Sequence, residues 1–154
     1  MGEARFHNAV ARMPELFEQL LSCELLEMKA RPNWRGLPAI YVFYDAAGEP
    51  CHTGRTRNLQ GRVRAHTADS HNSASFAFKS ARQVLNLNAT YKPEGSRAHL
   101  MSDPVFKAEF DRQRGAIGQM KLRYVEIECP IEQHLFELYV ALRLGTSLTE
   151  FTTS

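Results

Sequence analysis

The strongest constraint on the fold is a predicted β-hairpin in the first third of the chain. Residues 39–44 read Ala-Ile-Tyr-Val-Phe-Tyr, an apolar, β-branched and aromatic run that favours a strand. Residues 45–49 read Asp-Ala-Ala-Gly-Glu, which is typical of a turn with Gly48 at a positive φ. Residues 50–54 then return as the partner strand. The sequence therefore predicts an antiparallel pair at the centre of the fold.

Helices and one further strand are predicted around this hairpin. Residues 14–29 carry apolar side chains at spacings of three and four, which indicates a helix with Pro14 in its first turn. Residues 123–129 alternate between apolar and polar side chains, which favours a third strand with one buried face. Residues 90–101 are predicted to be a loop. The other predicted helices cover residues 58–67, 73–87, 104 to about 118, and 130–144.

This order of elements predicts an α+β fold, a small three-stranded antiparallel sheet flanked by helices. A chain of 154 residues is the right size for one domain with one core. We expect residues 1–36 to form an N-terminal helix and a linker. Residues 37–151 then form the core, with a helical insertion at about 71–118.

Composition excludes several classes of protein. No apolar run approaches the ~20 residues that a membrane helix needs, and no secretory signal pattern is seen. The three cysteines, Cys23, Cys51 and Cys129, lie far apart, which argues against a disulfide framework or a zinc site and suits the cytoplasm. The formal net charge is only +2, so nucleic-acid binding would have to come from local patches.

A cluster of basic side chains follows the hairpin. A guanidinium group can bind a phosphate through two parallel hydrogen bonds. Arg62 and His66 are four residues apart and share a helix face with Asn58. Basic residues on a helix are more often a solvated face, and a single histidine is more often structural, but the clustering favours anion binding. The candidate phosphate-binding residues are Arg55, Arg57, Asn58, Arg62, Arg64 and His66.

One carboxylate stands out on the last predicted helix. Glu137 has no Lys or Arg three or four residues away, and from residue 135 onward the helix is apolar nearly all round. A buried carboxylate needs a partner, and Mg²⁺ is often held by only one or two protein carboxylates. Two other interpretations stay open, namely an exposed side chain near the rim and a pair with an arginine from another element.

These residues together resemble the GIY-YIG endonuclease superfamily over roughly residues 37–151. Residues 39–41, Ala-Ile-Tyr, match its first motif, and residues 52–54, His-Thr-Gly, match its second with His52 in place of tyrosine. Residues 72–79 and 144–151 further resemble a poorly characterised bacterial branch. The remaining positions that match are Arg55, Asn58, Leu59, Arg62, His66 and Glu137, while Thr149 stands where the family carries Asn.

The resemblance implies hydrolysis of DNA phosphodiester bonds with one Mg²⁺ or Mn²⁺ ion held by Glu137. In that scheme Arg62 neutralises charge on the phosphoryl group, and Tyr41 positions or deprotonates the attacking water. His52 changes the expectation. Imidazole, with a reference pKa near ~6.5, is a plausible base, or it marks a descendant that no longer cuts. Thr149, which is expected to bind substrate at the position of that Asn, keeps a hydroxyl but loses the amide.

Three functions therefore stay open from the sequence. The first is a cytoplasmic, Mg²⁺-dependent DNA endonuclease with Tyr41, His52, Arg62, His66 and Glu137 as catalytic residues. The second is a nucleic-acid-binding module in which cleavage is impaired. The third is a protein-interaction module that keeps only the fold. None of these requires a membrane.

Overall fold

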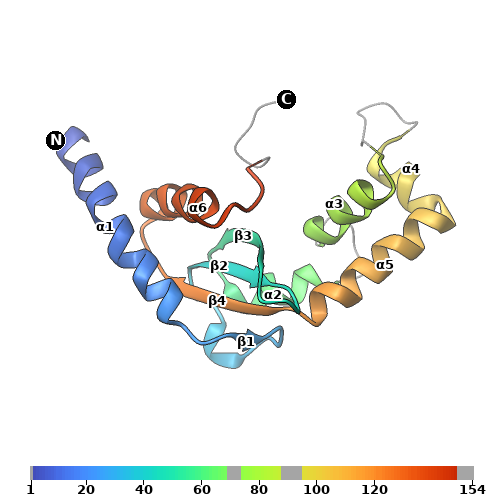
Figure 1. Ribbon diagram of the computed structural model, residues 1–154, viewed down its shortest axis with the longest axis horizontal. Coiled ribbons are helices and arrows are strands. Elements are labelled where there is room, and N and C mark those ends of the chain that lie inside the picture. Colours follow the sequence, from blue (N-terminus) through green and yellow to red (C-terminus); the bar gives the residue numbers. More distant parts are fainter. Residues whose placement is uncertain (1, 69–73, 88–94, 149–154) are drawn as a thin grey trace. The chain divides into compact units, whose positions relative to one another are not determined.

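The computed structural model describes residues 2–68, 74–87 and 95–148 (Figure 1). The chain divides into two compact units, each described by itself. The first contains residues 1–61 and 120–154, and the second contains residues 62–119. The boundary falls within helix α2 (Leu59–His66). The helical insertion that the sequence predicts at about 71–118 lies inside the second unit.

The first unit is built on an antiparallel sheet (Figure 1). In the described residues the sheet has four strands in the order β1-β4-β2-β3, so β3 lies at one edge. The α+β class is confirmed, and the prediction of three strands is wrong by one. The strands are β1 (Leu26–Glu27), β2 (Ala39–Tyr44), β3 (Pro50–Thr56) and β4 (Lys121–Glu126).

The predicted N-terminal helix differs most from the structure. Helix α1 runs from Gly2 to Ser22 with Pro14 inside it, so the helix begins 12 residues earlier and ends seven residues earlier than predicted. Its buried side chains recur at spacings of three and four. The end of the predicted helix is instead strand β1, whose Leu26 pairs with Leu122. That pairing partner lies almost 100 residues away, so local periodicity could not reveal it.

Other boundaries shift by a few residues. Strand β4 begins and ends before the predicted 123–129, and β3 continues two residues past Gly54. The stretch predicted as a loop at 90–101 contains most of helix α4 (Arg97–Ser102), which Ser96 caps by accepting a bond from the His99 N–H. The remaining elements are η1 (Pro32–Trp34), α3 (Ser75–Val84), α5 (Pro104–Gly118) and α6 (Pro130–Leu144).

The core of the first unit lies between one face of the sheet and helices α1 and α6. Ile40, Val42 and Tyr44 of β2 supply that face. The helices contribute Met13, Leu16, Phe17, Leu20, Phe136 and Val140. The other face of β2 is also covered, since every residue of the strand is buried. This two-sided burial explains why residues 39–44 are apolar throughout instead of alternating.

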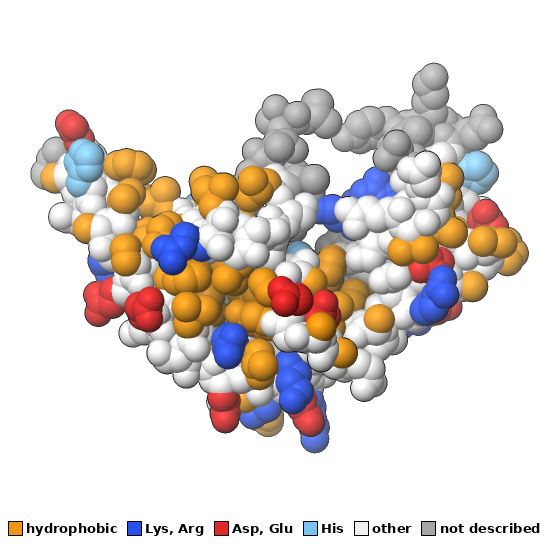
Figure 2. Space-filling view, in the orientation of Figure 1, with side chains coloured by type: hydrophobic (Ala, Val, Ile, Leu, Met, Phe, Trp, Pro, Cys, Tyr) orange, Lys and Arg blue, Asp and Glu red, His pale blue; other side chains and the backbone are white. Residues whose placement is uncertain are grey.

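Hydrophobic side chains remain at the surface of this unit. Phe6 on α1 is 52% exposed and Leu142 on α6 is 60% exposed. Figure 2 shows hydrophobic atoms at the surface over both helices. No helix in the part of the chain that the structure describes is both long enough and apolar enough to cross a bilayer.

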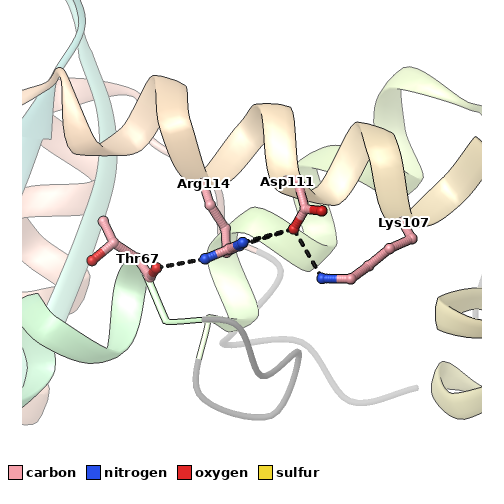
Figure 3. Close-up of polar contacts among 4 residues, drawn as sticks. All are labelled: Thr67, Lys107, Asp111 and Arg114. Atoms are coloured by element: carbon pink, nitrogen blue, oxygen red, sulfur yellow. Dashed lines mark hydrogen bonds and ion pairs between the residues drawn. The ribbon is translucent and has the colours of Figure 1, made fainter.

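Helices α3, α4 and α5 pack together in the second unit. Phe78 of α3 and Phe106 of α5 are buried, with ring centroids 5.2 Å apart. Arg114 of α5 donates from Nη1 to the carbonyl of Thr67, 2.9 Å away, just beyond the end of α2 (Figure 3). A cation at a helix C-terminus is favourable, because the last carbonyls carry partial negative charge. This contact joins α2 to α5.

Asp111 predicts a pH effect on this unit. Its carboxylate pairs with Arg114 and Lys107 (Figure 3), and hydrogen bonds from Arg114 and then Lys107 lower the pKa of Asp111. Because the folded-state pKa is lowered, the stabilisation is present above about pH 4 and is lost as the pH falls through the folded-state pKa. Thermal unfolding from pH 7 to pH 2 should show Asp111→Asn melting below wild type at neutral pH. Curves that stay parallel into acid would contradict this role.

The cysteines should differ in reactivity. Burial, and then the charge of Asp45, raise the pKa of Cys51 to about 11. Cys129 sits at the N-cap of α6, where the backbone N–H of Glu132, followed by that of Ile131, lowers the pKa of the thiol. Since the thiolate is the nucleophile, iodoacetamide at neutral pH should modify Cys129 before Cys51, as followed by peptide mass spectrometry. Equal rates in the folded protein, matching those in guanidinium chloride, would refute this.

Candidate nucleic-acid interface

The predicted motif residues Tyr41 and His52 lie together on the hairpin. Tyr41 is opposite Gly54, and Phe43 is opposite His52, so all four residues share one face of the β2–β3 pair. The centroids of the Tyr41 and His52 rings are 5.9 Å apart, and Phe43 contacts both rings. Tyr41 is only 1% exposed, while His52 is half-buried. The structure therefore brings together the two motif positions that the sequence singled out.

Gly54 is required by the position of the Tyr41 ring. A Cβ atom built on Gly54 would lie 2.3 Å from the hydroxyl oxygen of Tyr41 and 2.4 Å from its Cζ. Real Cβ atoms do not approach other atoms this closely, and the buried ring has little room to move. The glycine therefore lets the tyrosine ring rest directly on the backbone of the edge strand.

Arg55 and Glu137 form an ion pair on the opposite face of the hairpin. Arg55 is opposite Ile40, which belongs to the α1–α6 core face. Arg55 Nη1 is 3.3 Å from Glu137 Oε1, and the two side chains are 41% and 3% exposed. Of the interpretations left open for Glu137, the exposed side chain is wrong. The pair with an arginine from another element is present in the structure.

Two further polar contacts fix α6 against β3. Gln133, one turn before Glu137, donates from Nε2 to the carbonyls of Thr56 and Ile127, at 3.1 and 2.9 Å. The hydroxyls of Thr53 and Thr146 are 2.9 Å apart and buried. No role was predicted for Gln133, Thr53 or Thr146. The sequence signal that could have found Gln133 is an amide four residues before Glu137, on the same face of a largely apolar helix.

The residues around Glu137 can be compared with what Mg²⁺ requires. Within residues 2–68, 74–87 and 95–148, no group of three or more His, Cys, Asp and Glu side chains is placed to hold a metal ion. Mg²⁺ does not need such a group, because waters and substrate phosphate complete its octahedron around one or two carboxylates. Glu137 supplies the one carboxylate that such a site needs, and Arg55, whose Nη1 is 3.3 Å from Oε1, would have to move for an ion to bind at that oxygen.

Asn58 has a structural role. It lies just before α2 instead of within it, and its Oδ1 accepts bonds from the N–H groups of Gly36, at 2.9 Å, and Gly61, at 3.3 Å. The second bond caps the helix, and the first ties α2 to the loop after η1. These bonds account for Asn58 without a substrate, so its place on a shared face with Arg62 and His66 is not observed.

For the other candidate residues, the structure gives burial and few contacts. Arg57 is exposed just after β3, and Arg64 is exposed on α2. Arg62 is half-buried, whereas His66 is fully buried and meets the Phe76 ring edge-on at a centroid distance of 6.3 Å. Both belong to the second unit, so their approach to Tyr41 and Glu137 stays a prediction. Thr149 lies outside the described residues.

The two groups of hairpin residues meet at the edge of the sheet. His52 and Arg55 lie on strand β3, three residues and about 10 Å apart along the strand. Their side chains point to opposite faces of the pair, and β3 is an edge strand of the sheet in the described residues. Comparison with family models, with curated proteins and with solved structures found no match to this chain.

Proposed function

We propose that the protein is a metal-dependent endonuclease that hydrolyses phosphodiester bonds in DNA, built on a GIY-YIG-like hairpin. The observation that carries the proposal is the Tyr41 ring lying on Gly54 beside His52, on the strand that also presents Arg55 to Glu137. An aromatic hydroxyl, an imidazole, a guanidinium and a carboxylate can supply the acid–base and electrostatic catalysis that phosphodiester hydrolysis needs. The proposed setting is the cytoplasm.

Each residue has a distinct role in this proposal. Arg55 is proposed to leave Glu137 and bind a nonbridging phosphate oxygen, and Glu137 would hold Mg²⁺ or Mn²⁺. When bound, the ion supplies Lewis-acid polarisation of the phosphate. Tyr41 and His52 lie on the opposite face of the hairpin from the Arg55–Glu137 pair. Their proposed roles, orienting the attacking water and accepting its proton as the new oxygen–phosphorus bond forms, therefore require the substrate to pass around the edge strand β3. The bond to the leaving 3′ oxygen breaks, and that oxygen takes a proton from solvent. Arg62 is proposed to neutralise the transferring phosphoryl group.

Cleavage of supercoiled plasmid tests this function. Protein with Mg²⁺ or Mn²⁺ should produce nicked circles, and a chelator should stop the reaction. Linear duplex, branched DNA and single-stranded RNA of equal length should be compared beside it. A Glu137→Gln protein purified in parallel reports contaminating nucleases. Equal nicking by both proteins, or no product from any substrate, would overturn the proposal.

A nucleic-acid-binding module without cleavage is the second candidate function. The Arg55–Glu137 pair favours it, because the guanidinium already neutralises the carboxylate that would hold the metal. This candidate predicts binding that weakens steeply with salt, since phosphate contacts release counterions. It also predicts the same affinity with Mg²⁺ and with a chelator. A Glu137-dependent product would exclude it.

A further inference from the structure

We propose that Arg82 and Arg97, both held against the ring of Phe78, form a phosphate clamp on the helical unit 62–119 that binds a backbone phosphodiester of nucleic acid. The inference rests on the proposed nucleic-acid function and deepens it. It assigns a contact on residues that are not among the proposed catalytic residues.

The two guanidinium groups share one aromatic ring. The Cζ atom of Arg82 is 5.4 Å from the centroid of the Phe78 ring, and the Cζ atom of Arg97 is 5.1 Å from it. Phe78 is buried against Phe106, so the ring is a fixed platform. Stacking on an aromatic ring orients the planar fork of arginine and reduces the freedom it loses when it binds an anion.

Neither arginine is neutralised within the described part of the unit. Nε of Arg82 is buried without a hydrogen-bond partner there, and no ion pair to Arg82 or Arg97 occurs among the described residues. The described carboxylates of the unit are used elsewhere: Asp103 caps α5, Glu109 pairs with Arg112, and Asp111 pairs with Lys107 and Arg114.

Two like charges at one place are unfavourable without an anion. Burial, and then the positive charge of Arg97, lower the pKa of Arg82. Arg82 lies in the last turn of α3, where the helix dipole favours a cation. An anion bound between the two guanidinium groups would relieve their mutual repulsion.

The charge of the unit indicates which anion binds. Residues 62–119 carry nine Lys or Arg side chains against five Asp or Glu, whereas the whole chain carries 19 against 17. The excess of positive charge is thus confined to this unit. A phosphodiester presents two nonbridging oxygens, and each can accept from one guanidinium. A polyanion such as nucleic acid also gains from the surrounding positive field, which a single small anion does not.

Binding of the full-length protein to labelled duplex DNA tests the clamp, measured by fluorescence anisotropy over a series of salt concentrations with chelator present. Arg82→Gln/Arg97→Gln should weaken binding about tenfold or more and lower the slope of log affinity against log salt by about 1.8, because two phosphate contacts are lost. The matched control is Lys29→Gln/Lys121→Gln, which removes the same charge from exposed positions of the other unit. Equal behaviour of the two double variants would overturn the clamp.

A single variant separates binding from folding. Arg97→Gln removes the repulsion on Arg82, so its unfolding temperature without nucleic acid should be equal to or above that of wild type, while DNA affinity falls. A fall in both would show a structural role and overturn the inference. Single-stranded RNA and inorganic phosphate at matched ionic strength are tested as competitors. Loss of DNA binding in the Arg82/Arg97 variants with normal Glu137-dependent cleavage at high protein concentration would support the clamp, whereas absence of cleavage with a working clamp would count only against the nuclease.

Discussion

Glu137→Gln should abolish metal-dependent DNA nicking, with a loss on the order of 100-fold or more, while the protein stays folded. The amide keeps the shape of the carboxylate but cannot hold Mg²⁺ as an anion. Its former partner Arg55 is 41% exposed and regains water when the pair is broken. The free energy of unfolding should therefore change by less than about 1 kcal/mol. Plasmid nicking and urea unfolding measure the two effects.

Arg55→Gln, in contrast to Glu137→Gln, should lower the stability of the fold. It leaves the Glu137 carboxylate, which is 3% exposed, without the guanidinium, so the free energy of unfolding should fall by about 1–3 kcal/mol. The double variant Arg55→Gln/Glu137→Gln should be more stable than Arg55→Gln alone. Arg57→Gln is the matched control, because Arg57 is an exposed arginine of the same segment and its loss should not affect stability. Equal destabilisation by Arg55→Gln and Arg57→Gln would show that the ion pair does not stabilise the fold.

Gly54→Ala should destabilise the first unit by about 3 kcal/mol or more, a large share of the 5–15 kcal/mol typical of a domain. The added methyl group would lie 2.3 Å from the Tyr41 hydroxyl, and the buried ring cannot move without disturbing Phe43 and His52. Denaturant unfolding followed by circular dichroism gives the size of the effect. Binding of DNA should be lost with the fold.

Two control experiments test whether the effect of Gly54→Ala comes from the Tyr41 ring. Gly115→Ala on α5 meets no atom within 4 Å and should stabilise the protein by about 0.5–1 kcal/mol, because alanine favours a helix. Tyr41→Leu removes the clashing atoms, so Gly54→Ala should cost less in that background than in wild type. If the two changes are additive, the ring of Tyr41 is not what excludes a side chain at position 54.

The parts of the fold that depend on local signals were predictable. Strand β2 at 39–44 and helix α6 at 130–144 match the predicted ranges, since an apolar run and a Pro–Gly bounded pattern define them locally. Strand β1 was missed because two residues carry no periodicity, and only pairing with β4 makes them a strand. Helix α4 was missed because a six-residue helix is marked by little more than the Ser96 cap.

In the candidate site, too, features set by local sequence were predictable and contacts between distant residues were not. The sequence predicts Tyr41 and His52 on paired strands, and the register shows in addition that they share a face. It also identified Glu137 as a buried carboxylate in need of a partner, but spacing along one helix could not choose Arg55, which lies 82 residues away. The same limit applies to the buried Thr53–Thr146 contact. The approach of Arg62 and His66 to these residues stays a prediction.

The amide of Gln133 has a consequence for how tolerant α6 can be. Because Gln133 donates to carbonyls of both β3 and the segment that precedes α6, it sets the rotational phase of the helix. Each residue of a helix turns by about 100°, so one residue inserted between positions 133 and 137 would aim Glu137 away from Arg55. The four-residue spacing between Gln133 and Glu137 therefore fixes how the carboxylate is aligned with β3. Exposed residues of α6 can be substituted, but a change in this spacing would separate Glu137 from Arg55.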